Sequence, residues 1–213
     1  MRPDDSPSGR KRNPIIEEAR RAQIIAATIE TVAAAGFAQA SLAQIAQNAE
    51  ISKSVISYHF SGKDELLAQV VEQIYEDAWA YIGPRLETET SAAGRLRAYI
   101  EANLQYMKTH RERLLAVITI VGNLRAADGS MRFPPSSDDS VITLLTEILE
   151  DGRRNGEFRD LDPRVVAVTV GQALVGVLGE WAMNPGADLD AYAAELAVLF
   201  DHATRKQERH SCP

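Results

Sequence analysis

Cysteine is nearly absent from the sequence. Only one of the 213 residues is a cysteine, Cys212, and it lies beside the C-terminal residue. A single cysteine excludes an internal disulfide framework and a cysteine-based zinc cluster. Because disulfides are rare in reducing compartments, this composition favours a cytoplasmic protein.

Targeting and cofactor signals are also missing. Residues 1–14 are polar and contain prolines and basic residues in place of the apolar core of a secretory signal. The longest apolar run without a charge, 165–179, has 15 residues, fewer than the roughly 20 of a membrane span. It is therefore predicted to be a buried helix of a soluble protein. There is no phosphate-binding glycine loop, no dinucleotide fingerprint and no ligand spacing for a metal, so neither cofactor nor metal is expected.

Charge is distributed unevenly along the chain. The net charge of −7 taken alone argues against nucleic-acid binding, which usually has a basic footprint. Residues 1–63, however, hold eight basic and six acidic side chains, whereas the remainder holds 15 basic and 24 acidic ones. The acidity therefore belongs to the C-terminal part, and the N-terminal part is mildly basic.

Apolar residues recur at steps of three and four through most of the chain, and no stretch alternates as a strand would. Hydrophobic residues make up 45% of the sequence, which is enough for a core. The pattern predicts an all-α protein of about nine helices. Gly36 is expected to end the first helix, and Gly83-Pro84 the fourth. The predicted helices span 15–35, 41–48, 52–58, 63–82, 92–109, 111–123, 137–151, 162–183 and 188–205.

Two short helices follow the first long one in quick succession. Ser41 and Gln44 form a capping box, and Ser52 and Ser61 are candidate caps of the next two helices. Two short helices separated by a brief turn and braced by a longer helix define a helix-turn-helix, which reads DNA in the major groove. Here the turn would hold Glu50-Ile51.

Residues 24–67 resemble the N-terminal domain of the TetR family of one-component transcriptional repressors. The resemblance rests on the order and spacing of several short segments. They are AAGF at 34–37, SLAQIA at 41–46, ISK at 51–53, ISYHF at 56–60 and SGKDELL at 61–67. The sequence departs from the family in the turn, where Glu50 replaces a common glycine, and at Ser54, Val55 and Ser57, where glycine, threonine and tyrosine are common.

The resemblance implies roles for residues of the helix-turn-helix. Phosphate contacts would come from side chains at the end of the second short helix, and base contacts from its start. Ser41, Ser52 and Ser61 are alternatively caps only, and Gln44 alternatively only closes the capping box. The predicted phosphate contacts are Ser41, Tyr58, His59 and Lys63, and the predicted base contacts are Gln44, Lys53, Ser54, Val55 and Ser57. Ser52 is a further predicted DNA contact.

The resemblance also divides the chain. Ahead of the resembling segments, the basic, proline- and serine-containing composition of residues 1–13 predicts a disordered basic arm, which is either a solvated tail or an arm that enters the minor groove. Residues 14–62 form the DNA-binding domain, and residues 63–213 the ligand-binding and dimerisation domain. Candidates for a lipophilic pocket, each alternatively a core residue, are Tyr75, Trp79, Tyr99, Asn103, Tyr106, Met107, Ile118, Val121, Leu145, Gln172 and Trp181.

Small residues spaced by four in helix 162–183, together with apolar residues of the last helix, predict a four-helix dimer interface. The alternative is packing within one chain. The predicted interface residues are Ala167, Gly171, Val175, Gly179, Leu196, Leu199 and Phe200. The function predicted is a homodimeric repressor that binds a palindromic operator in double-stranded DNA and is released by a small lipophilic effector. Alternatives are an activator, a ligand-independent DNA-binding regulator and, remotely, a small helical enzyme, although no catalytic constellation is apparent.

Overall fold

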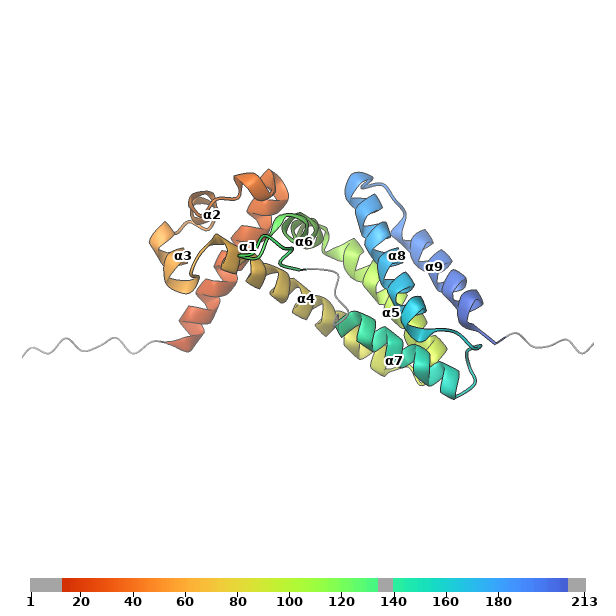
Figure 1. Ribbon diagram of the computed structural model, residues 1–213. Coiled ribbons are helices and arrows are strands. Elements are labelled where there is room, and N and C mark those ends of the chain that lie inside the picture. The colour runs from red at the N-terminus through yellow and green to blue at the C-terminus, as the bar shows by residue number, and fades with distance from the viewer. Residues whose placement is uncertain (1–12, 134–139, 207–213) are drawn as a thin grey trace, which may run out of the picture.

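The computed structural model describes residues 13–133 and 140–206, most of which lie in helices (Figure 1). This part of the chain contains nine helices and two isolated bridges but no strand, which confirms the all-α prediction. The helices are α1 (Pro14–Gln39), α2 (Leu42–Asn48), α3 (Lys53–His59), α4 (Lys63–Glu87), α5 (Ala92–Thr109), α6 (Arg111–Asn123), α7 (Ser140–Arg154), α8 (Pro163–Met183) and α9 (Leu189–Thr204).

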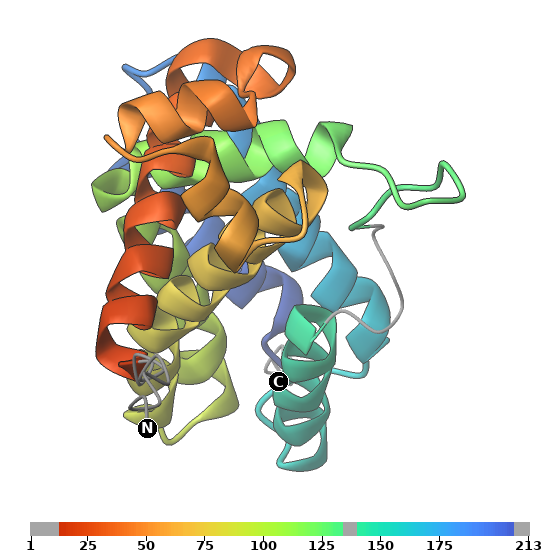
Figure 2. The ribbon, with the colours of Figure 1, turned by 90° about the vertical axis from the view of Figure 1, so that its left-hand side faces the viewer.

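Helices α1, α2 and α3 form a unit at one end of the molecule, and α4 leads from it to the other helices (Figure 1). The unit is held by apolar side chains from all three helices and from the start of α4, among them Ile24, Ile45, Ile56 and Leu66, all fully buried. Helix α1 also packs extensively against α6, which it crosses in Figure 2. The N-terminal unit is thus attached to the rest of the protein both through α4 and through α6.

Helix α1 begins and bends where its sequence signals lie. The Asn13 side chain accepts a hydrogen bond from the Ile15 amide at 3.2 Å, and Pro14 occupies the first turn, where its missing amide hydrogen costs nothing. Gly36 has a φ of 80°, which a residue with a side chain rarely adopts. The predicted break at Gly36 is confirmed, although one more helical turn follows it.

The predicted end of α4 at Ile82 is wrong, because the helix continues through Gly83-Pro84 to Glu87. A proline in the last turn removes a single helical hydrogen bond. The side chains of Ile82 and Leu86 lie one turn apart on the same face and are both buried, so their packing holds this turn in place. Tertiary packing here outweighs the local breaker signal.

Helix α5 is the centre of the C-terminal bundle and packs against α4, α7, α8 and α9, and α7 packs along α8. Helix α8 is long and apolar enough to cross a membrane, judged by length and composition only. In the structure, 28% of its most apolar stretch is buried inside the protein. The prediction that 165–179 is a buried helix is therefore only partly right. Val165, Val168 and Val175 on α8 are exposed, as are Val198 and Leu199 on α9.

Glu50, in the turn between α2 and α3, has a φ of 53°, in the left-handed region that favours glycine. We expect Glu50→Gly to raise the free energy of unfolding by about 0.5–1 kcal/mol, because strain relief exceeds the added freedom of the unfolded chain. Urea denaturation measures this. Glu50→Ala is the control, since it removes the same charge but keeps the strain; equal stability of the two variants would contradict the explanation.

Candidate nucleic-acid interface

Of the three serines predicted to cap helices of the helix-turn-helix and the start of α4, one makes a side-chain cap. The Ser41 hydroxyl accepts a hydrogen bond from the Gln44 amide at 3.2 Å and so caps α2. Ser52 takes the N-cap position of α3 without a side-chain cap, and its hydroxyl lies 2.8 Å from that of Ser54. Ser61 does not cap α4, whose N-cap residue is Gly62. The cap interpretation thus holds for Ser41 only.

Helix α1 fastens the other two helices by polar contacts as well as by its apolar face. The Gln23 amide donates to the Ala49 carbonyl at 2.8 Å, at the start of the turn. The Asn48 amide donates to the Ala27 carbonyl at 3.2 Å and to the Glu30 carboxylate at 3.1 Å. These contacts fix the C-terminal end of α2, and with it the start of the turn that leads to α3, on α1.

The orientation of α3 follows from one buried side chain. Ile56 is fully buried against the core of the N-terminal unit, and the flanking Lys53, Ser54 and Ser57 are exposed, with Val55 half-buried. On the preceding helix, Gln44 is exposed as well. The structure therefore brings the predicted base-contacting side chains to the surface, most of them on one short helix.

The side chains predicted to contact phosphate differ in their exposure and in their partners within the protein. Tyr58 is 58% exposed, and its hydroxyl donates to a Glu17 carboxylate oxygen at 3.3 Å. The half-buried His59 ring packs edge-on against Tyr58 with centroids 5.0 Å apart. The Lys63 ammonium donates to the Phe37 carbonyl at 2.8 Å and lies 4.7 Å from the Phe37 ring centre. In this conformation Lys63 ties α4 to the end of α1.

Sequence reasoning missed Arg21, which joins α1 to the C-terminal end of α3. Its guanidinium donates to the His59 carbonyl at 2.8 Å and to the Gln69 side chain on α4, and it lies 4.6 Å from the centre of the Phe60 ring. The acceptors are 38 and 48 residues further along the chain. No local pattern signals such a contact.

Glu65 supplies a pH-dependent contact at the start of α4. Hydrogen bonds from Ser61 hold the pKa of the Glu65 carboxyl below its usual value. Because the folded-state pKa is lowered, the contact stabilises the fold above about pH 4.5, the unfolded value, and is lost as the pH falls through the folded pKa. We expect Glu65→Gln to lose stability at pH 7 but little at pH 3; thermal melts at both values measure this. An equal loss at both would contradict it.

Charge in the described part of the helix-turn-helix is balanced. Residues 13–63 carry four basic and four acidic side chains, and three of the four cations, Arg20, Arg21 and Lys63, donate hydrogen bonds within the protein. The excess positive charge of the first 63 residues therefore belongs to Arg2, Arg10, Lys11 and Arg12. Those residues are part of the predicted arm, which except for Asn13 lies outside the described residues.

The predicted pocket residues of the C-terminal bundle fall into three groups. Side chains in the core are Tyr99, Tyr106, Met107, Leu145 and Trp181; half-buried ones are Asn103 and Val121; exposed ones are Tyr75, Trp79, Ile118 and Gln172. The Asn103 amide donates to the Tyr99 carbonyl one turn back at 2.8 Å. The alternative core role therefore fits the first group, and a role at a ligand stays a prediction for the rest.

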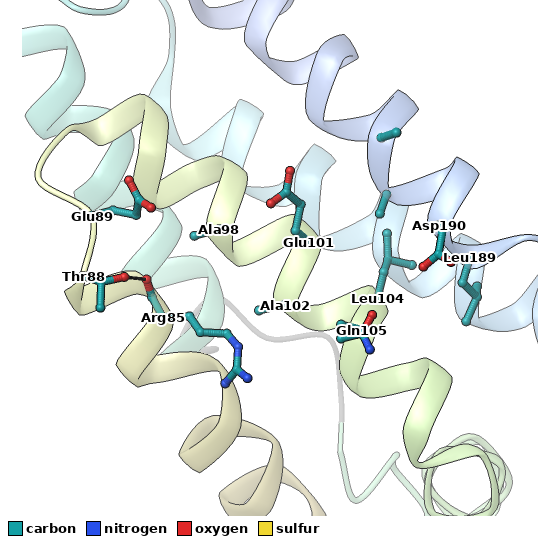
Figure 3. A pocket seen from close by; sticks show the side chains of 12 residues that line it. Arg85, Thr88, Glu89, Ala98, Glu101, Ala102, Leu104, Gln105, Leu189 and Asp190 are labelled. Atoms are coloured by element: carbon teal, nitrogen blue, oxygen red, sulfur yellow. Dashed lines mark hydrogen bonds between the residues drawn. The ribbon is translucent and has the colours of Figure 1, made fainter.

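A hollow of about 530 Å³ lies elsewhere, between the end of α4, the middle of α5 and the start of α9 (Figure 3). Alanines and leucines form its apolar part, and charged residues such as Arg85, Glu89, Glu101 and Asp190 surround them. None of the residues predicted to contact the ligand lines this hollow, and sequence periodicity gave no signal for it.

The predicted dimer residues are also divided. Val175 and Leu199 are 59% and 54% exposed, and Gly171, Gly179 and Leu196 are half-buried. Ala167 and Phe200 are buried within their own chain. A side chain at Gly171 would approach Ile142 of α7 to 3.2 Å, so the small residue there permits close packing of α7 on α8. Packing within the chain thus accounts for Ala167, Phe200 and Gly171.

Within residues 13–133 and 140–206, no three histidine, cysteine or acidic side chains are placed to hold a metal ion.

The architecture of this part is that of a helical regulator, with a braced helix-turn-helix at one end and a larger bundle at the other.

Two family models match the chain. The model described as bacterial regulatory proteins, tetR family, matches residues 24–70, and the tetracyclin repressor-like C-terminal domain matches residues 89–200. Together they cover well over half of the sequence. The chain therefore belongs to the TetR family of transcriptional regulators, as the resemblance predicted.

Curated relatives and solved structures agree with this assignment. The chain is 37% identical over 95 residues to the HTH-type transcriptional regulator BetI of Paraburkholderia phytofirmans, covering 44% of this chain and 49% of the relative. For BetI of Burkholderia mallei the identity is 38% over 89 residues, with 41% and 46% covered. The matches thus span about half the length of these relatives.

Among solved structures, a TetR-family regulator from Rhodococcus superposes with a TM-score of 0.75 at 22% identity, covering 86% of this chain and 98% of that one. The fatty acid degradation regulator FadR from Bacillus halodurans gives 0.71 at 19% identity, covering 86% and 99%. At these identities the likeness concerns the fold.

Proposed function

We propose that the protein is a homodimeric repressor whose α3 helices bind successive major grooves of a palindromic operator. The observation that carries this proposal is the braced position of α3. Ile56 fixes the helix on the core, and Lys53, Ser54 and Ser57 project from it to solvent. Short polar side chains on a rigid helix suit hydrogen bonds to base edges.

A dimer accounts for the apolar surface of α8 and α9. Val165, Val168 and Val175 on one helix and Val198 and Leu199 on the other are exposed in the single chain. Several large apolar side chains exposed on two adjoining helices are typical of an association site. Two copies of the pair related by a two-fold axis would form a four-helix interface, which covers these side chains and gives the two α3 helices the symmetry of a palindrome.

The effector is proposed to be a small lipophilic molecule that binds among the apolar and aromatic side chains of the C-terminal bundle. The long helix α4 supports a coupled mechanism, because its start is buried in the helix-turn-helix core at Leu66 and Leu67 and its end in the bundle at Leu86. An effector that prefers one tilt of α4 changes operator affinity by the difference in its binding to the two states, typically 1–3 kcal/mol.

Selection of bound sequences from a random DNA library tests the proposal. The result expected is enrichment of one palindrome whose half-sites lie about one helical turn apart. Enrichment of no sequence, or of a site without two-fold symmetry, would contradict it. An activator would bind the same kind of site, and transcription in vitro with and without the protein separates the two. A duplex of the enriched sequence then serves to screen lipophilic molecules for release.

A further inference from the structure

A network of hydrogen bonds links the end of α3 to α4 through a side chain of α1. Arg21 on α1 donates to the His59 carbonyl, in the last turn of α3, and to the Gln69 side chain on α4. Gln69 in turn donates to Glu65 at 2.9 Å, and the other oxygen of Glu65 accepts from the Ser61 amide in the connection between α3 and α4. These hydrogen bonds thus connect α1, α3, α4 and the short segment between α3 and α4.

The Arg21 guanidinium supplies a hydrogen-bond donor to a carbonyl in the last turn of α3. The last carbonyls of a helix have no intrahelical partner, and the helix dipole makes that end negative. A guanidinium placed there donates to a free carbonyl of α3 and is attracted by the dipole. The Phe60 ring, which directly follows α3 and is buried, covers one side of the guanidinium at 4.6 Å.

Arg21 does not have the geometry of a phosphate contact. Its side chain is partly buried, both terminal nitrogens already donate to protein acceptors, and its ring contact lies against the core. Arg20, the preceding residue, is also half-buried, but it donates to Gln23 on its own helix. The two adjacent arginines therefore differ in their partners, because only Arg21 reaches α3 and α4.

We propose that Arg21 is a positioning residue for operator binding, which sets the pose of α3 relative to α4 without touching DNA. This inference rests on the proposed DNA-binding function of α3. An arginine is required because its planar guanidinium donates to two acceptors on different helices at once. A lysine ammonium is a single point charge on a flexible stem and does not hold both acceptors in a fixed arrangement. A shift of α4 is transmitted to the end of α3 through Gln69 and Arg21.

The test compares Arg21→Lys with the matched control Arg20→Lys, since neither changes the net charge. Fluorescence anisotropy measures the affinity of each for the selected operator and for a random duplex over a range of salt concentrations. Arg21→Lys is expected to bind the operator roughly tenfold more weakly, the equivalent of about one charge-assisted hydrogen bond. Its affinity for random DNA and its salt slope are expected to equal those of the unmodified protein, and Arg20→Lys is expected to bind the operator normally.

Three results would overturn the proposal: unchanged operator affinity for Arg21→Lys, an equal loss on random DNA, and a smaller salt slope, which marks a phosphate contact. Circular dichroism checks that the variant is folded. If Arg21→Lys unfolds, the same affinity measurements are made on Gln69→Met, which removes only the α4 acceptor of Arg21. Unchanged operator affinity of Gln69→Met would then overturn the proposal. A failure of the proposed function looks different, since the unmodified protein would then not distinguish the selected duplex from random DNA.

Discussion

Replacing Val175 and Leu199 together with glutamate is expected to give a folded monomer that binds the operator roughly 100-fold or more weakly than the unmodified protein. Both side chains are more than half exposed in the single chain, on α8 and α9, so the substitutions cost the monomer little. In a dimer they would place four like charges in an apolar interface. Joining two α3 helices makes the second half-site contact intramolecular, and that advantage disappears with the dimer.

Light scattering coupled to size-exclusion chromatography measures the mass, and anisotropy the affinity. Met131→Glu is a suitable control, because it also places a carboxylate at a partly exposed apolar side chain but lies outside α8 and α9. The control is expected to remain a dimer with normal affinity. A double variant that stays dimeric, or a monomer that binds the operator as tightly as the unmodified protein, would refute the proposed interface.

Lys53→Ala is expected to lower operator affinity by about 1–3 kcal/mol for each half-site and to relax the preference at one base position. Lys53 opens α3 and is exposed, which suits a hydrogen bond to the acceptors of guanine. A second round of DNA selection with the variant identifies the position that has lost its preference.

The matched control is Lys206→Ala, which removes the same charge beyond the end of α9. It is expected to leave both affinity and preference unchanged. If Lys53→Ala kept the original preference and weakened all sequences alike, Lys53 would be a phosphate contact and the base contact assigned to it would be wrong.

Helix boundaries could be predicted wherever local signals decide them. Both ends of α5 and α6 lie where the apolar periodicity predicts them, and the Gly36 break agrees with its positive φ. The end of α4 could not be predicted, because packing in the hydrophobic core keeps Leu86 buried beyond Pro84. Packing is not visible to a rule that considers only neighbouring residues.

The same distinction applies to the candidate site. The exposed residues of α3 follow from a recognisable helix-turn-helix and one buried isoleucine, Ile56. The contacts that Arg21 and Lys63 make within the protein could not be predicted in this way, because their acceptors lie 26 or more residues away along the chain. Small residues spaced along α8 permit a close neighbour without indicating which one; at Gly171 the neighbour is α7 of the same chain.

The most direct test of a dimer on a palindrome is to titrate the unmodified protein against the full selected operator and against one isolated half-site, with the stoichiometry measured by native mass spectrometry. Two chains should bind the full operator, and the half-site should bind at least tenfold more weakly, because only one α3 helix can then engage its site. A single chain on the full operator, with equal affinity for the half-site, would contradict the proposed mode of binding.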